Sequence, residues 1–323
     1  MNQVKKMVKN LLNQLIKIIK PYYSKMKKFY YRERTINKIN GPKTSKRIYI
    51  IRRPPKDFGF FSNFFYVLGH LVYADKNGYA PVIDMENYPT LYNENKLCKN
   101  TKNSWEYYFY QPSEFDLETA YKSNKTILSG DKYFSEYLPI YTDNHKRFMS
   151  EEMVKDLHIY IDKYVKVKED IETEVSDFFK EKGLKDSIVL GVHYRGTDMN
   201  VYPGHPKPVT KEEFIKKINS YVKDNNVQKV VLCTDEQEMI DLACKEVLCD
   251  VVFTNSFRAK EGTKGIHQTA DSREGHKYLM GKEVLVDALV LSRCDYLLCG
   301  HSNVPYAAML FNNNEYKAWE YVV

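Results

Sequence analysis

The chain has 323 residues, of which 28% are charged, and a formal net charge of +7. No run of about 18 apolar residues occurs, and the N-terminus lacks the apolar region and cleavage site of a signal peptide, so neither a transmembrane helix nor a secretory leader is expected. Residues 1–50 hold fourteen Lys and Arg against one acid, Glu33, so they carry +13 and the remainder carries −6. Basic charge confined to one end argues against a protein whose whole surface binds nucleic acid.

Residues 2–20 have the pattern of an amphipathic helix, because apolar side chains recur every three or four positions with lysines between them. Pro21 is expected to end this helix. Residues 22–34 then mix tyrosines with Lys and Arg, a composition typical of an interfacial membrane anchor. Packing on the protein's own domain or a partner, and nucleic-acid binding, are the alternatives. Residues 35–46 are expected to form a linker.

A first α/β unit is predicted to begin after this linker. It consists of a strand at 47–52, a turn at 57–63 with Gly59, a helix at 64–75 and a second strand at 80–84. The turn has neither the GxGxxG nor the Walker A pattern.

The middle of the chain is less regular. Residues 85–135 are rich in loops and aromatic side chains, and we expect most of the rings at 105–110 to lie in the core. The periodicity of residues 151–182 predicts one long helix that bridges the two halves, with Gly183 as its C-cap.

The second half alternates strands and helices again, as expected for a second Rossmann-like unit. Its polar stretches at 199–208 and 255–275 are expected to be flexible. The predicted strands are 188–192, 229–234, 250–254 and 295–299, and the predicted helices are 211–223, 238–247, 277–292 and 303–311.

The cysteines are expected to be reduced. Cys233, Cys294 and Cys299 stand in or beside apolar strands, as small buried hydrophobic side chains do in a reducing compartment. Two C-x4-C pairs resemble metal ligands, but no His or Cys partner stands at zinc-finger spacing, so no metal is predicted. The remaining cysteines are Cys98, Cys244 and Cys249.

The strand that ends before Arg195 is the centre of the functional prediction. It brings polar side chains to its carboxyl end, where open α/β sheets bind ligands. An arginine fixed there suits the diphosphate of a nucleotide sugar. The alternative is a surface ion pair between Arg195 and Asp198. Three strand ends, at 193–198, 234–236 and 300–303, are expected to converge on one crevice, the last with helix N–H groups that can bind an anion.

Three short motifs follow one another in this half. The first is His193-Tyr-Arg195-Gly-Thr197-Asp198, the second spans 284–295 and includes Asp287, and the third is Cys299-Gly-His-Ser302-Asn303. In order and spacing they resemble the motifs of the α1,6-, α1,2- and protein O-fucosyltransferases, with the best match to the α1,6 and nodulation-type branch. Gly59-Phe-Phe-Ser62-Asn63 resembles more loosely the glycine turn of their N-terminal domain. The resemblance covers residues 186–312 well and 48–95 weakly.

The resemblance implies an α/β, GT-B-like fold of two Rossmann-like domains facing a cleft, and an inverting transfer of fucose from GDP-fucose without a metal or other cofactor. Arg195 would hold the β-phosphate, with Asp198 orienting it. His193 and Asp287 would face the guanine or its ribose. Further donor-binding positions would be Thr234 and Asp235 at the nucleoside, Ser302 and Asn303 at the phosphate, and Ser62 and Asn63 in the N-terminal turn.

Departures from the family pattern leave parts of the mechanism open. Gly196 replaces the second arginine that α1,6 enzymes often carry, and Met199 and Pro203 replace a lysine and a glutamate. The donor's phosphate would therefore be bound more weakly, or another cation would complete its binding. The general base does not transfer from the family. The cations considered are Arg258, Lys264 and Arg273, and the bases considered are Asp84, Glu86, His205 or no strong base at all.

The leading hypothesis is a fucosyltransferase that acts on a glycan, perhaps lipid-linked, and is peripheral on the cytoplasmic face of the inner membrane through residues 2–34. The alternatives are the same fold with another nucleotide-sugar donor, and a catalytically silent, membrane-tethered protein that binds nucleotide or glycan. The expected division is a basic helix and linker at 1–46, an acceptor-side domain with the bridging helix at 47–185, and a nucleotide-sugar-binding domain at 186–323.

Overall fold

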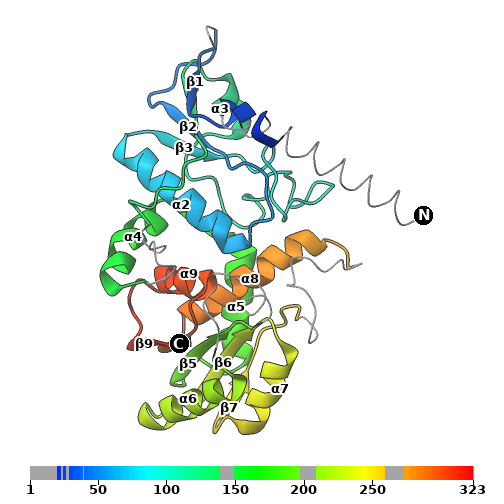
Figure 1. Cartoon of the computed structure of the whole chain (residues 1–323), viewed down its shortest axis with the longest axis vertical. Coiled ribbons are helices and arrows are strands. Elements are labelled where there is room, and N and C mark those ends of the chain that lie inside the picture. Colours follow the sequence, from blue (N-terminus) through cyan, green and yellow to red (C-terminus); the bar gives the residue numbers. More distant parts are fainter. Residues whose placement is uncertain are drawn as a thin grey trace, which may run out of the picture.

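The computed structural model describes residues 20–22, 25–26, 29–38, 40–138, 149–196, 209–258 and 273–322. Two β-sheets lie at opposite ends of the long axis, with helices between them (Figure 1). Within the described residues, no helix has the length and apolar content needed to cross a bilayer. The predicted α/β class is confirmed.

The N-terminal sheet has the order β1-β4-β2-β3. Strands β4, β2 and β3 are parallel, and β1 is antiparallel to β4. Helix α2 (Phe60–Lys76) packs on the face that carries Tyr49 and Ile51, and α3 (Leu117–Lys122) packs on the face that carries Ile48 and Ile50, because successive strand residues point to opposite faces. The strands are β1 (Arg34–Ile36), β2 (Ile48–Ile51), β3 (Ala80–Ile83) and β4 (Thr126–Leu128).

The C-terminal sheet is fully parallel in the order β7-β6-β5-β8-β9. Leu190 and Val192 of β5 face α6 and α7, whereas Val189 faces α8 and α9, so helices cover both sides. The elements are β5 (Val189–Tyr194), α6 (Lys211–Asp224), β6 (Lys229–Thr234), α7 (Gln237–Glu246), β7 (Asp250–Val252), α8 (His276–Ser292), β8 (Tyr296–Cys299), α9 (Asn303–Asn312) and β9 (Ala318–Tyr321).

One apolar core runs through both halves. It includes side chains of α2, α8 and α9, and the rings of Phe64 on α2 and Phe311 on α9 lie 5.7 Å apart. Helix α4 (Glu151–Tyr164) also contacts both α2 and α9. The boundary predicted at 185/186 falls between α5 (Glu169–Glu181) and β5, yet the core crosses it.

The single bridging helix predicted at 151–182 is wrong, because two helices, α4 and α5, occupy it. Between them the chain is extended and pairs with the aromatic segment: the Tyr110 N–H donates to Lys166 O at 2.9 Å, and the Lys168 N–H donates to Tyr108 O at 2.9 Å. Backbone pairing therefore replaces one turn of helix. The C-cap of α5 is Lys182, one residue before the predicted Gly183, and Gly183 follows it with the left-handed φ of 60° that ends a helix.

Three further expectations change. Helix α2 begins at Phe60, inside the predicted turn, because Gly59 serves as its N-cap. Residues 34–36 of the expected linker form β1, and residues 20–22 are helical, so the helix does not end at Pro21. Residues 2–19 of the predicted amphipathic helix lie outside the described residues.

The prediction that the aromatic cluster is core is confirmed for Trp105, Tyr107, Tyr108 and Phe109, each at most 3% exposed.

Candidate functional site

The carboxyl ends of β6, β5 and β8 lie side by side, as the sequence predicts. His193 pairs in register with Cys299, and Tyr194 with Thr234. The Gly300 N–H donates to His193 O at 3.3 Å. The structure therefore brings three of the predicted strand ends to one edge of the sheet, where a ligand can contact all of them.

Arg195 lies where the two halves of the molecule meet. It is half-buried, directly after β5. Burial raises the pKa of Tyr92, which comes from the N-terminal half, to about 12, while a hydrogen bond with the Phe60 backbone and the positive charge of Arg195 both lower it. The Arg195 guanidinium is therefore placed to act on a ligand held between the halves.

His193 is a buried neutral imidazole beside this arginine. It is 6% exposed, and its Nδ1 is buried without a hydrogen-bond partner among the described residues. Burial, followed by the charge of Arg195, lowers its pKa to about 3. A buried polar atom left unpaired is costly, so this nitrogen is available to a polar ligand.

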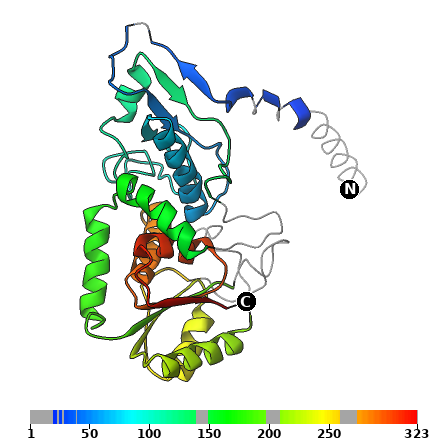
Figure 2. The same ribbon diagram turned by 90° about the vertical axis from the view of Figure 1, so that its left-hand side faces the viewer.

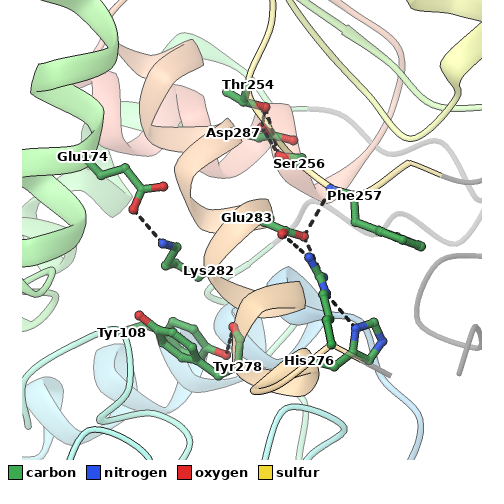
Figure 3. Close-up of polar contacts among 11 residues, drawn as sticks. Tyr108, Glu174, Thr254, Ser256, Phe257, His276, Tyr278, Lys282, Glu283 and Asp287 are labelled. Atoms are coloured by element: carbon green, nitrogen blue, oxygen red, sulfur yellow. Dashed lines mark hydrogen bonds and ion pairs between the residues drawn. The ribbon is translucent and has the colours of Figure 1, made fainter. Parts of the chain in front are cut away.

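Asp287 on α8 is held by two hydroxyls at the end of β7 (Figure 3). Thr254 Oγ1 donates to its Oδ1 at 2.5 Å, and Ser256 Oγ donates to the same oxygen at 2.9 Å. Burial raises the pKa of Asp287 to about 6, although these two hydrogen bonds and the charge of Arg258 lower it. The carboxylate is thus charged at neutral pH, and Oδ2 is not used by either hydroxyl. The sequence analysis missed Thr254 and Ser256, although polar residues at the end of the predicted strand 250–254 and just after it were a usable signal.

Ser302 is the N-cap of α9. Its Oγ accepts from the Val304 N–H at 3.4 Å, and the residue is 3% exposed. Before it, His301 Nδ1 lies 2.9 Å from the Tyr306 hydroxyl. The N-terminus of α9 therefore opens at the same edge as His193, with its helix dipole directed there.

Ser62 and Asn63 lie in the first turn of α2 and hold an arginine that the sequence analysis missed. Arg53 NH1 donates to Asn63 Oδ1 at 2.8 Å and to Ser62 O at 2.9 Å, and its guanidinium lies 3.4 Å from the centre of the Phe58 ring. Arg53 is the second residue after β2, and only the fold shows that it stacks on Phe58. The side chains of 62 and 63 therefore position a cation at the start of α2.

The two halves are joined beside this site by α8. The Tyr108 hydroxyl donates to Tyr278 O at 3.0 Å, and the two rings stack 5.7 Å apart (Figure 3). A Cβ at position 281 would lie 2.2 Å from the Tyr108 hydroxyl, so Gly281 is required for this contact. An ion pair of 2.7 Å between Lys282 and Glu174 fixes the next turn of α8 to α5.

No family model matches the sequence, and no curated protein matches it. The structure, by contrast, is similar to solved structures. A crystal structure of NodZ alpha-1,6-fucosyltransferase soaked with GDP-fucose superposes with a TM-score of 0.51 at 15% sequence identity, over 82% of this chain and 93% of that chain. A structure of NodZ co-crystallised with GDP gives 0.50 at 16% identity, over 83% and 93%. A mutant of Arabidopsis thaliana FUT1 in complex with GDP gives 0.50 at 10% identity, over 88% and 71%.

The chain has the fucosyltransferase fold. The similarity covers more of the chain than the C-terminal half alone contains, so it extends to the N-terminal sheet, where the sequence resemblance was weak. The GT-B-like architecture expected from the motifs is confirmed.

Against this fucosyltransferase fold, the departure at Gly196 has a structural counterpart. A Cβ at this position would lie 2.1 Å from Glu236 Oε1. Glu236 forms an ion pair of 3.0 Å with Lys211, which also contacts Glu238. Burial lowers the pKa of Lys211, but the hydrogen bonds that its ammonium donates to both glutamates outweigh burial and raise the pKa overall. A carboxylate therefore occupies the space that a side chain at 196 would enter, and the Gly196 N–H itself lies 3.5 Å from Asp235 Oδ1.

The cations considered for the missing grip are placed differently. Arg273 forms a bidentate ion pair with Glu283, at 2.6 and 3.1 Å, and its Nε donates to His276. Arg258 donates to Thr254 O, beside Asp287. Arg258 is thus the cation beside Asp287, whereas Arg273 is paired with Glu283 on α8. Lys264 lies outside the described residues.

The proposed bases are also separated by the structure. Asp84 is fully buried, and its two oxygens accept four hydrogen bonds, from Glu86 N, Asn87 N, Asn87 Nδ2 and the Tyr121 hydroxyl. This saturated carboxylate shapes a turn, so it leaves no lone pair for a substrate proton. Glu86 is exposed. His205, like Thr197, Asp198, Met199 and Pro203, lies outside the described residues.

The cysteine prediction is confirmed for the three strand-associated residues, since Cys233, Cys294 and Cys299 are at most 4% exposed. In the part of the chain that the structure describes, no group of three or more His, Cys, Asp or Glu side chains is arranged to hold a metal ion.

Proposed function

We propose that the protein is an inverting, metal-independent glycosyltransferase that transfers fucose from GDP-fucose to a hydroxyl group of a glycan. The observation that carries the proposal is the edge of the C-terminal sheet. Arg195, neutral His193 and the N-terminus of α9 converge there, within a fold similar to proteins whose structures contain GDP or GDP-fucose.

Each group has a role in this reaction. Arg195 binds the diphosphate and stabilises the charge that develops on it as the glycosidic bond breaks. The N–H groups at the start of α9 add further donors to phosphate oxygens. Asp287 is charged above pH 6 and its Oδ2 can accept from the N1–H and N2–H of guanine, which a uracil ring does not offer. His193 hydrogen-bonds the nucleoside through Nδ1.

Arg53 extends the site into the N-terminal half. It is oriented by Asn63 and stacked on Phe58, so its guanidinium is fixed at the N-terminus of α2. A fixed cation there suits the sugar-phosphate end of the donor. The acceptor base stays open between Glu86, His205 and a transition state that needs no strong base.

The decisive test is thermal stabilisation by GDP, UDP, CMP, dTDP and ADP, followed by their sugars, because a ligand that binds only the folded state raises the melting temperature. We expect shifts with GDP and GDP-fucose. A shift with another nucleotide would replace the donor while keeping the fold. No shift with any of them would favour the silent binding protein.

Two further measurements test the finer claims. Retained transfer in excess EDTA supports metal independence, and its loss contradicts it. The anomeric configuration of the product, read by nuclear magnetic resonance, distinguishes inversion from retention.

We further propose that the enzyme is peripheral on the cytoplasmic face of the inner membrane, held by its basic N-terminal segment, and that a lipid-linked glycan is its acceptor. The supporting observation is the +13 charge of residues 1–50 beside aromatic side chains. Deleting residues 1–34 should abolish binding to anionic vesicles, and salt should weaken the attachment of the intact protein. Binding that survives the deletion contradicts the assignment.

A further inference from the structure

Arg52 is a buried cation with an unusual set of partners. It is 1% exposed at the end of β2, and among the described residues no carboxylate lies within ion-pair distance. Among the described residues, the hydrogen-bond partners of its guanidinium are neutral oxygens: Ser129 O at 2.9 Å, and the Tyr88 hydroxyl, Tyr30 O and Arg32 O at 3.1 Å each. Burying a charge without a counter-charge is costly, so these bonds must offset a substantial penalty.

Two of those partners belong to the basic N-terminal segment. Arg52 NH2 donates to both Tyr30 O and Arg32 O, so one side chain joins this segment to the central strand of the N-terminal sheet. The rings of Tyr30, Tyr31 and Tyr88 surround the guanidinium, with centroids 5.3 to 5.7 Å from it. We call Arg52 and these three tyrosines the arginine clamp.

Backbone pairing continues the attachment. The Asp131 N–H donates to Tyr31 O at 2.8 Å, and β1 then pairs with β4 along its whole length. Residues 30–36 are therefore fixed to the sheet, and they are not a free linker between the basic segment and the body of the protein.

Beyond the clamp, the segment presents large apolar side chains to solvent. Every described residue from 20 to 30 is helical. Tyr22, Met26 and Phe29 are 70%, 71% and 61% exposed, and their spacing of four and three is that of residues on one face of a helix. The Arg32 guanidinium lies 4.2 Å from the centre of the Phe29 ring, so a cation accompanies this apolar group. Figure 2 shows the helical pieces leaving the body of the molecule. Large apolar side chains that are exposed together mark an interaction site.

The charge around this face selects its partner. Lys20, Lys25, Arg32 and Arg34 accompany it, in a stretch with a single acid. Basic side chains beside large apolar ones match a lipid surface with anionic headgroups, because the rings enter the interface while the cations remain at the phosphates.

We propose that Tyr22, Met26 and Phe29 insert into an anionic lipid surface, and that the arginine clamp fixes this inserted helix rigidly to the N-terminal sheet. Attachment then sets the orientation of the whole enzyme on the bilayer, and Arg52 is a positioning residue. The inference rests on the proposed membrane attachment.

The insertion face is tested with vesicles of phosphatidylcholine and phosphatidylglycerol (3:1) and with pure phosphatidylcholine. Replacing Tyr22, Met26 and Phe29 together with serine should weaken sedimentation with the anionic vesicles at least tenfold. Leu97→Ser with Leu248→Ser removes large apolar side chains that are also exposed, 66% and 58%, but lie elsewhere. This control should bind like the wild type. Equal binding by the triple variant overturns the assignment of the face.

The clamp is tested with Arg52→Gln against Arg47→Gln, an exposed arginine whose loss changes the charge equally. In solution, hydrogen exchange of peptides covering 29–36 should accelerate at least tenfold in Arg52→Gln only, with β5 and β6 still protected as proof of folding. Arg52→Lys keeps the charge but forms fewer hydrogen bonds, so it should fall between the two. Unchanged exchange in folded Arg52→Gln overturns the clamp.

Orientation is tested by energy transfer on the same vesicles. A donor dye at position 118, introduced by Glu118→Cys in a Cys244→Ser background, reports its distance from rhodamine-labelled lipid. Arg52→Gln should bind within about twofold of the wild type but change the transfer efficiency. Unchanged efficiency contradicts the orienting role. If the wild type does not bind anionic vesicles at all, the membrane attachment itself fails, and the exchange experiment still decides whether the clamp exists.

Discussion

Arg52 and Arg195 occupy corresponding places in the two sheets. Each stands at or just after the carboxyl end of a strand that has parallel neighbours on both sides. Arg52 is almost fully buried and its hydrogen bonds end on protein oxygens, whereas Arg195 is half-buried beside a buried imidazole nitrogen that has no hydrogen-bond partner among the described residues. The same position in an α/β unit therefore holds a buried structural cation in one sheet and, in the other, the half-buried cation for which we propose ligand binding.

The largest effect is expected at Arg195. Arg195→Ala should lower the rate of transfer from GDP-fucose by about 10²–10³-fold, since one donor that stabilises developing charge contributes about that much. Its free energy of unfolding should change by about 1 kcal/mol or less, as for a partly exposed side chain. Initial rates and urea unfolding measure the two quantities. Normal transfer by the variant would show that Arg195 does not act on the donor, and the proposed difference between Arg195 and Arg52 would be wrong.

Arg52 should show the opposite profile. Arg52→Met leaves the carbonyls of Tyr30, Arg32 and Ser129 without this donor. Ser129 is fully buried, and an unsatisfied buried group costs roughly 1–3 kcal/mol, so we expect about 3 kcal/mol of lost stability with the loss of the other two bonds included. Affinity for GDP should stay within about twofold at a temperature where the variant is folded. Titration calorimetry measures the affinity for GDP, and urea unfolding measures the stability. An unfolding curve identical to that of the wild type would show that Arg52 is not structural.

Asp287 links the ligand site to pH. Its pKa of about 6 lies above the usual value, so the folded state binds the proton more tightly than the unfolded chain, and this residue's contribution to stability increases as the pH falls from 7 towards 5. GDP binding should weaken over the same range, because the protonated carboxyl accepts less well from guanine. Calorimetric titration with GDP between pH 5 and 8 measures this loss.

Asp287→Asn is the matched variant for that measurement. Removing the buried charge should stabilise the protein by about 1–2 kcal/mol while GDP affinity becomes weak and independent of pH. A pH profile identical to that of the wild type would assign the titration to another group.

The smallest effect is expected at Gly196. Gly196→Ala places a Cβ against Glu236, and displacing this carboxylate from Lys211 should cost about 1 kcal/mol in stability. In a Glu236→Ala background the same change should cost nothing, because the space is empty. Additive costs in a double-mutant cycle would show that the two positions are independent.

Much of the C-terminal site could be predicted from the sequence. Strand β6 has the predicted bounds. Each end of α6, α7, α8 and α9 lies within one residue of its predicted position. Strands buried on both faces give continuous apolar runs, and the polar residues after them mark the carboxyl ends. Ser302 at a helix start and Arg195 after a strand could therefore be placed together before any coordinates.

The N-terminal half was harder to predict. The strands β1 and β4 have only three residues each, too few to show a pattern, and α3 has only six. The pair Arg52 and Arg53 looks like two exposed basic residues at a strand end, because their partners stand far away in sequence, as with Ser129. The break between α4 and α5 likewise depends on backbone pairing with residues 108–110, and the helical periodicity of the sequence gives no sign of this pairing.

The sequence alone determined most of the longer strands and helices of the two α/β units, that the N-terminal 50 residues carry the basic charge, and which polar side chains reach the edge of the C-terminal sheet. These features follow from local periodicity and from the common direction of parallel strands. The tertiary structure decided what each charged group does there. It filled the lone pairs of Asp84 with hydrogen bonds, paired Arg273 with Glu283, and left His193 Nδ1 without a hydrogen-bond partner among the described residues. It also buried Arg52 where its guanidinium donates to the N-terminal segment. The physical reason is that the cost of a buried charge depends on the oxygens and nitrogens brought to it, and these come from distant parts of the chain.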